Sequence, residues 1–409
     1  MNVPRLRILL LLLLGVTPLV RVFVAGVPLY ATDLVLLVLA CSFLRPHRLA
    51  PCQRRVLGTA ALVVASTAPS LLIGLFADAH PLFTLYYYGR RVLAVAAFGT
   101  FLVLFSADAA LRRRTLRALL LATIVSSVWC VAQVLTRSTG LVGALDHIYY
   151  DVLARAVLEP SVNRWGAAWK TPRAVGGWWN ANSMGAALTL GLLLTPAVRA
   201  WPWGALATSA GWLGLVATGS RQALIGSGVF VAALLGRGGR RSAARRSWML
   251  AACAAGLVAA LLIAGAQGAR ALGAREGSLE EGFASRWNNY PDFWGALAAS
   301  TPATFLFGRG AESWTVVSRS GTTLEPGAFV SNTLLLTLAE NGVLTLLAFL
   351  ALLARIVTQA EASWQRAGVV VVLWLLNCDN HLYLYPALTV LMWAALALAA
   401  APARLESPT

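Results

Sequence analysis

Residues 344–353 (LTLLAFLALL) contain no ionisable side chain, and runs of this kind recur along the whole sequence. Residues 8–20 (ILLLLLLGVTPLV) and 250–264 (LAACAAGLVAALLIA) are equally free of charge. Repeated apolar segments are typical of successive membrane spans. Backbone polar groups must be paired in hydrocarbon, and these runs lack the alternation of barrel strands, so they are predicted to be helices. The sequence therefore predicts an all-α, polytopic integral membrane protein.

The composition agrees with a membrane protein and excludes a basic, soluble nucleic-acid-binding protein. Of the 409 residues, 58% are hydrophobic and 12% are charged, about half the charged fraction of a soluble domain. Much of the net charge of +17 comes from arginines in short loops, where positive charge fixes orientation. The five cysteines show no metal-ligand spacing. We expect no metal, no cofactor and no nucleic acid as a partner.

About twelve spans are expected, and two long segments interrupt them. This divides the chain into five N-terminal helices (1–136), a long loop (137–179), four helices (180–269), a second long loop (270–327), and three helices with a tail (328–409). Both loops are expected to contain short helices, and their length and aromatic content favour a functional site there. The spans are expected near residues 8–25, 27–44, 56–77, 86–107, 116–135, 180–198, 203–219, 221–236, 247–269, 328–354, 366–384 and 386–402.

The arginines predict the orientation of the spans. The arginines in alternate short loops fall on one face of the membrane. The positive-inside rule makes that face cytoplasmic, and both termini lie on it. The exceptions lie on the opposite face: Arg90, Arg91, Arg173, Arg221, Arg286 and Arg309. Guanidinium groups bind phosphate oxygens in a fork and keep their charge when desolvated. The alternative is that some of them reach lipid headgroups, least so Arg221, which lies in a very short connection between two helices.

Four ordered stretches resemble motifs of the bacterial O-antigen ligase and polymerase family. Residues 177–185 (GWWNANSMG) are similar to its G-x-x-x-N-x-N helix entry, and residues 218–223 (TGSRQA) to its T-x-S-R-x-A turn. Residues 285–310, from SRW through FW to LFGRG, resemble its loop with an arginine followed by G-x-G. Residues 331–344, from SNTL to AENGVL, resemble its H-N-x-x-L…E-x-G helix.

The resemblance implies glycan transfer from undecaprenyl diphosphate at the periplasmic face of the bacterial inner membrane. The acceptor would be lipid A–core for a ligase, or another lipid-linked repeat for a polymerase. Arg221 and Arg286 match the arginines of the family and are the leading candidates to stabilise the leaving diphosphate. Arg90, Arg91, Arg173 and Arg309 could add to that field, and Asn332 matches the asparagine of the family's helix. Asn182 is interpreted as a helix cap or a saccharide contact.

One departure from the family concerns the general base, because Ser331 stands where the family has histidine. His381 could replace it, with Asp379 orienting the imidazole, although residues two apart on a regular helix point away from each other. A structural polar cluster in the turn is the alternative for this pair. Glu312, Glu325 and His147 are further candidates. The remaining alternatives are a protein without ordinary transfer activity and, in another class, a small-anion transporter.

Overall fold

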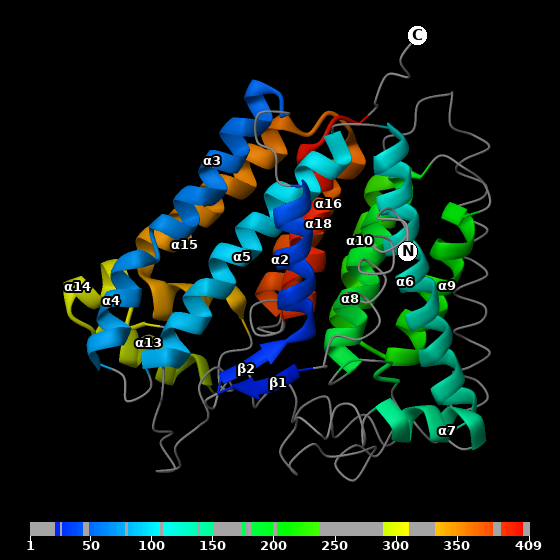
Figure 1. Cartoon of the computed structure of the whole chain (residues 1–409), viewed down its shortest axis with the longest axis horizontal. Coiled ribbons are helices and arrows are strands. Elements are labelled where there is room, and N and C mark those ends of the chain that lie inside the picture. Colours follow the sequence, from blue (N-terminus) through cyan, green and yellow to red (C-terminus); the bar gives the residue numbers. More distant parts are fainter. Residues whose placement is uncertain are drawn as a thin grey trace.

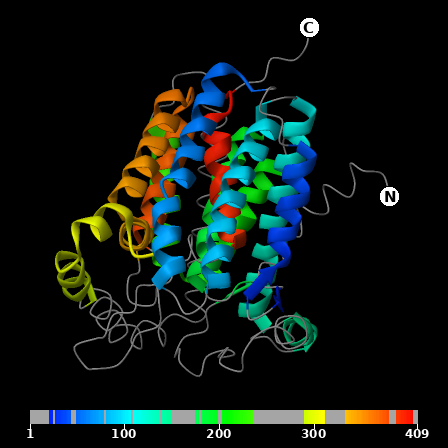
Figure 2. The ribbon, with the colours of Figure 1, turned by 60° about the vertical axis from the view of Figure 1, so that its left-hand side comes forward.

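The structure is a computed structural model, and it is mostly helical. It describes residues 21–24, 27–43, 49–77, 81–106, 109–136, 140–149, 174–176, 178, 181–198, 203–236, 289–310, 332–378 and 386–403. Figures 1 and 2 show a bundle of helices with short helices at one end. In chain order the elements are β1 (Arg21–Val24), β2 (Val27–Tyr30), α2 (Ala31–Phe43), α3 (Pro51–Ala65), α4 (Ala68–Ala77), α5 (Pro81–Ser106), α6 (Ala109–Thr136), α7 (Gly140–Asp146), α8 (Ala181–Leu194), η3 (Thr195–Ala197), α9 (Trp203–Thr218), α10 (Arg221–Gly236), α13 (Asn289–Ala298), α14 (Pro302–Phe307), α15 (Thr333–Gln359), α16 (Ser363–Cys378) and α18 (Pro386–Ala400).

Four described helices have the length and apolar composition needed to cross a membrane. They are Pro51–Phe76, which joins α3 and α4, Thr84–Ser106, Ala109–Thr136 and Thr333–Gln359. Shorter apolar helices cover Ala31–Phe43, Arg221–Leu234 and Leu388–Ala400. Helices cover the described parts of the expected spans from 56–77 onward and residues 31–43 of the span expected at 27–44. The span expected at 247–269 lies outside the described residues. The count of about twelve spans stays a prediction.

A two-stranded hairpin corrects the prediction for the first two spans. β1 and β2 pair antiparallel, with Arg21 opposite Tyr30, where the first helix was expected to end and the second to begin. Valine, phenylalanine and tyrosine in this stretch favour strands, and Gly26 and Pro28 disfavour a continuous helix. Helix α2 consequently begins at Ala31 rather than near residue 27.

The outer faces of the helices carry large apolar side chains, as expected of surfaces in contact with lipid. Examples are Leu34 and Leu37 on α2, Val128 on α6, and Leu344 and Leu347 on α15, all exposed. A soluble monomer rarely leaves such contiguous apolar surface open to water. Together with the apolar spans, these faces indicate an α-helical membrane protein.

Helix α8 lies at the centre of one half of the bundle and packs through small residues. Nearly all of its residues are buried. A Cβ atom at Gly191 would lie 2.3 Å from Thr123 Oγ1 on α6, and one at Gly185 would lie 2.5 Å from Ser220 Cβ. Small residues at such contacts let helix backbones approach closely, as is common between membrane helices.

The bundle has two chemically different ends. The arginine end is the end at which α3, α6 and α16 begin and α5, α15 and α18 finish (Figure 1). Gln359 donates to Cys52 O over 3.2 Å there. The loop end is the opposite one, and it carries α7, α13, α14 and the hairpin (Figure 1). Of the arginines predicted to be cytoplasmic, those that the structure describes all lie at the arginine end: Arg54, Arg55, Arg112, Arg113, Arg114, Arg117, Arg355 and Arg366.

Candidate functional site

Arg90 and Arg91 lie inside helix α5, in about its third turn, and not at its start. The sequence placed the start of this span near residue 86, but α5 begins at Pro81, a residue favoured in the first turn of a helix. Residues 86–89 are therefore helical as well. The two arginines remain near the loop end, as predicted, but they project from a helix into the protein rather than from a loop.

Arg91 holds a buried polar cluster between three helices. Its Nη2 atom lies 3.3 Å from Glu340 Oε2 of α15, and the two side chains are 16% and 3% exposed. Its Nη1 atom donates to Asn341 Oδ1, which also accepts from Ser70 Oγ of α4 over 3.1 Å. We call Arg91, Glu340, Asn341 and Ser70 the Arg91 cluster. It joins α4, α5 and α15 through charged and polar groups removed from solvent.

Helix α15 breaks next to this cluster, and a segment of the second long loop packs into the break. Gly342 has φ of 79° and ψ of 172°, so the helical hydrogen bonding is interrupted. The backbone N–H groups of Arg309 and Gly310 donate to the carbonyls of Ala339 and Glu340, over 3.2 and 3.0 Å. These amides satisfy carbonyls that a continuous helix would pair internally.

Two glycines make this approach of backbones possible. A Cβ atom at Gly308, whose φ is +80°, would lie 2.2 Å from Glu340 O. Reciprocally, a Cβ atom at Gly342 would lie 2.2 Å from Leu306 O. The G-x-G stretch and the E-x-G stretch of the sequence therefore contact each other directly, beside Arg91.

Arg90 faces a group of tyrosines near the same end. Its guanidinium carbon lies 5.5–5.6 Å from the ring centroids of Tyr30, Tyr86 and Tyr87, within cation–π range. Asp33 accepts from Tyr86 Oη over 3.1 Å and from Tyr30 N over 3.3 Å. These contacts hold the guanidinium in place among polarisable rings and next to a carboxylate.

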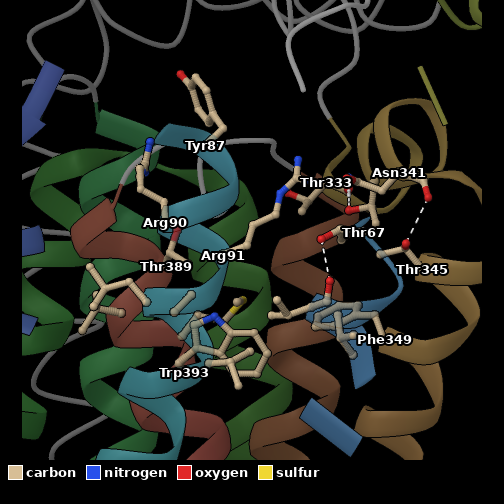
Figure 3. Close-up of a pocket in the computed structure, with 18 of the residues that line it drawn as sticks. Thr67, Tyr87, Arg90, Arg91, Thr333, Asn341, Thr345, Phe349, Thr389 and Trp393 are labelled. Atoms are coloured by element: carbon tan, nitrogen blue, oxygen red, sulfur yellow. Dashed lines mark hydrogen bonds between the residues drawn. The ribbon is translucent and has the colours of Figure 1, made fainter. Parts of the chain in front are cut away.

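A cavity of about 120 Å³ lies between α2, α3, α5, α15, α16 and α18. A single water needs roughly 10–15 Å³ by the same measure, so this cavity can hold a chain of several atoms. Figure 3 shows Tyr87, Arg90, Arg91, Thr333 and Asn341 toward one end of the cavity and Phe349 and Trp393 deeper within it. Apolar side chains make up much of the remaining lining and include Leu36, Leu93, Leu376, Val390 and Met392. The cavity thus combines a polar, cationic end with an apolar interior.

Arg221 occupies a second place at the loop end, and it does not line this cavity. It begins α10, after Gly219, which adopts φ of +58° and ends α9. The side chain of Arg221 is exposed, whereas Ser220 is fully buried. Gly185 of α8 packs against Ser220 and Ala223, so the N-x-N helix and the T-x-S-R turn also contact each other.

The other predicted residues within the described parts of the chain have local structural contacts. Arg309 Nη2 donates to Ser300 Oγ over 2.9 Å. Asn332 caps α15, its Oδ1 accepting from Leu334 N and Leu335 N over 2.9 and 3.0 Å. Asn182 lies in the first turn of α8, which begins at Ala181, so it lies within the helix. Arg173, Arg286, Asp379 and His381 lie outside the described residues, as do Glu312, Glu325 and Ser331.

Glu340, Asn341 and Asp33 are central to the site, and the sequence reasoning did not select them. The sequence did contain a signal for Asp33 and Glu340, because each is a carboxylate within an otherwise apolar helix. Intramembrane ionisable residues are rarely without a role. The partner of each could not be read from spacing. In comparison with known proteins, the chain matches no protein-family model and no curated protein.

Proposed function

We propose that this protein is a membrane glycosyltransferase that takes a saccharide from an undecaprenyl-diphosphate donor, as O-antigen ligases and polymerases do. The observation that carries the proposal is the cavity with arginines at one end and aromatic and aliphatic side chains along the rest. A lipid diphosphate has the same division, since an anionic head is joined to an isoprenoid chain. The head would lie at Arg90 and Arg91, and the first isoprene units against the apolar part of the lining.

The carboxylates next to Arg90 and Arg91 would compete with an anion that binds there. Arg91 is already paired with Glu340, and Asp33 lies near Arg90. A guanidinium has five N–H donors in a planar fork, so phosphate oxygens can share Arg91 with the carboxylate or displace it. We therefore expect an anion to bind by exchange within the Arg91 cluster, not by filling an empty positive pocket.

The packing of the four family-like stretches supports the proposal. The stretch around Gly185 contacts the turn at Ser220, and the stretch at residues 306–310 contacts residues 339–342. Both contacts lie at the loop end, although the pieces are far apart in sequence. This is the arrangement expected if the motifs belong to one fold, and it brings Arg221 and Arg91 to the same end of the bundle.

In the proposed reaction the acceptor hydroxyl attacks the anomeric carbon, and the bond from that carbon to the lipid diphosphate oxygen breaks. The diphosphate leaves with added negative charge, which fixed arginines stabilise. Arg221 and Arg286 are the candidates for this role by resemblance, and Arg91 by its place in the cavity. His381, oriented by Asp379, is proposed as the base that removes the proton of the hydroxyl.

The break in α15 favours a second candidate, a small-anion transporter. At about 1.5 Å per residue, Gly342 lies about 20 Å along the helix from Arg355, well inside a hydrocarbon layer of about 30 Å. Discontinuous helices with charged groups at this depth are typical of transporters. The apolar wall of the cavity favours a lipid-linked ligand over a small ion, so the transferase is the first proposal.

The cellular setting belongs to the same proposal. We infer a bacterial inner membrane, about twelve spans, both termini cytoplasmic and the loop end periplasmic, because arginines concentrate at the other end. The acceptor would be lipid A–core, or a second lipid-linked glycan if the protein is a polymerase.

Transfer by the purified protein in detergent tests the proposal, with an undecaprenyl-diphosphate oligosaccharide as donor, alternative acceptors and a chelator present. The variants are Arg91→Ala, Arg221→Ala, Arg286→Ala and His381→Ala, with Arg114→Ala at the arginine end as the matched control. We expect at least a tenfold loss of transfer in the first four and none in the control. If the wild type neither transfers nor binds the donor, while vesicles containing it take up a small anion such as bicarbonate, the transporter is correct.

A further inference from the structure

Helix α7 lies across the end of α6 at the loop end, and one of its faces is tied to α6 (Figure 1). The Asp146 carboxylate is buried and accepts from Trp129 Nε1 over 2.8 Å and from Gln133 Nε2 over 2.9 Å. Tyr149 is buried and packs edge-on against Trp129, with ring centroids 5.0 Å apart. These contacts fix which face of α7 points toward the bundle.

Another side of α7, continued by the π-helical turn of residues 147–149, is apolar and exposed. Leu141 is 77% exposed, and Leu145 and Ile148 are each 51% exposed. Leu141 and Leu145, four residues apart, share one side of α7, and Ile148 follows in the next turn. His147, also exposed, lies in the same turn as Ile148. A short helix with a tethered face and an apolar open face is the pattern of an element that lies in a membrane surface.

The position of α7 along α6 agrees with that level of the membrane. From Arg117 to Thr136, α6 is about 28 Å long at about 1.5 Å per residue, close to the roughly 30 Å of hydrocarbon in a bilayer. If Arg117 lies at one boundary, α6 leaves the hydrocarbon near Thr136, and α7 begins at Gly140. Val128 and Leu135 on α6 are 59% and 69% exposed, so apolar surface extends along α6 toward α7.

We propose that α7 lies in the boundary between headgroups and acyl chains at the loop end, with Leu141, Leu145 and Ile148 inserted among phospholipid chains. The occupant of this face is lipid, because the exposed apolar surface of the adjacent membrane span leads to it. This inference is independent of the proposed enzymatic function and would hold for a transporter as well.

The same contacts link this membrane surface to the Arg221 turn. Gln133, which holds Asp146, also accepts from Gly176 N over 2.9 Å and Val175 N over 3.2 Å. Ala174 N in turn donates to Ala217 O over 3.0 Å, in the last turn of α9. The lipid-bound helix α7 is thus connected through Gln133 to the residues that precede Arg221.

Depth-dependent fluorescence quenching tests the proposal with the full-length protein in phosphatidylcholine and phosphatidylglycerol vesicles. A single cysteine replaces Leu141, in a chain without its native cysteines, and carries an environment-sensitive dye. Leu135→Cys on α6 is the lipid-exposed reference, and His147→Cys is the control at a polar position in the turn after α7. The parent chain without an added cysteine gives the labelling background.

We expect lipids brominated near the carbonyl end of the chain to quench the dye at position 141 at least twofold more than at position 147. Aqueous iodide should give the opposite order. Strong iodide quenching at position 141 would place the face in water and overturn the proposal. Protection from both quenchers at position 141, with normal lipid quenching at position 135, would show a protein occupant and would also overturn it.

Discussion

Replacing Arg91 with methionine removes the guanidinium from a carboxylate that is 3% exposed. Methionine keeps much of the apolar stem, so the change isolates the charge. Removing one partner of a buried ion pair costs about 3–5 kcal/mol of unfolding free energy, because the other charge stays desolvated. Ser70 Oγ still donates to Asn341 Oδ1, so that amide keeps one contact. We therefore expect a loss of unfolding free energy near the upper end of this range, about 5 kcal/mol, only if Glu340 stays ionised.

A double-mutant cycle separates the ion pair from other effects. Glu340→Gln removes the second charge with little change of shape, so Arg91→Met/Glu340→Gln should be more stable than the sum of the single variants by about 2–3 kcal/mol. Unfolding in mixed micelles, followed by the fluorescence of the 15 tryptophans, measures each free energy. Arg114→Met, an exposed site at the arginine end, should change it by less than about 0.5 kcal/mol. Additive single variants, or an Arg91→Met protein as stable as Arg114→Met, would refute the reasoning.

Three further substitutions test particular contacts. Gly308→Ala should displace residues 308–310 from α15 and lower the unfolding temperature, since its Cβ would lie 2.2 Å from Glu340 O. Gly295→Ala is the control, because its Cβ would meet nothing within 4 Å, and it should not lower the unfolding temperature. Equal stability of the two variants would contradict the contact. Asn332→Ala should cost about 1–2 kcal/mol by loss of the cap of α15, and Asn332→Asp should recover most of it, so a stable alanine variant would exclude capping. Gly185→Val should separate α8 from the Ser220 turn and reduce the proposed glycan transfer, whereas Gly228→Val, in open space on α10, should leave both the unfolding temperature and transfer unchanged. Similar losses of transfer in the two variants would deny a specific role for this contact.

The membrane class and most helices follow from the sequence, because long uncharged runs leave the backbone no alternative to helix in lipid. The structure departs from these predicted helices at two places, and each departure has a cause in the local sequence. Around Gly26 and Pro28 the residues favour strands, and the apolar run obscured this. At Gly342 the preceding asparagine forms an Asn-Gly pair, a common turn signal, inside a segment that otherwise reads as one helix.

The partners in the site could not be read from the sequence. Arg91 and Glu340 are separated by 249 positions, and their meeting depends on the register between α5 and α15. Hydrophobic periodicity gives the face of a helix but not its displacement along a neighbour. In the structure, backbone contacts at Gly308 and Gly342 allow residues 306–310 to enter the break in α15 beside this ion pair. A one-turn shift of about 5.4 Å would separate the ion pair entirely.

These contacts divide Arg90, Arg91 and Arg221 into two kinds. Arg91 is bound to Glu340, and Arg90 lies against three tyrosine rings near Asp33, so their charges are largely balanced by the protein. Arg221 is exposed, and it makes no ion pair with any residue that the structure describes. If the ligand is the anionic donor proposed above, the positive potential that attracts it must come more from Arg221 than from Arg90 and Arg91. Arg90 and Arg91 are better suited to orient a head group that has already arrived, because their geometry is fixed by several contacts. On this argument, substitution of Arg221 should weaken association mainly through its rate and its salt dependence, while substitution of Arg91 should alter the bound state.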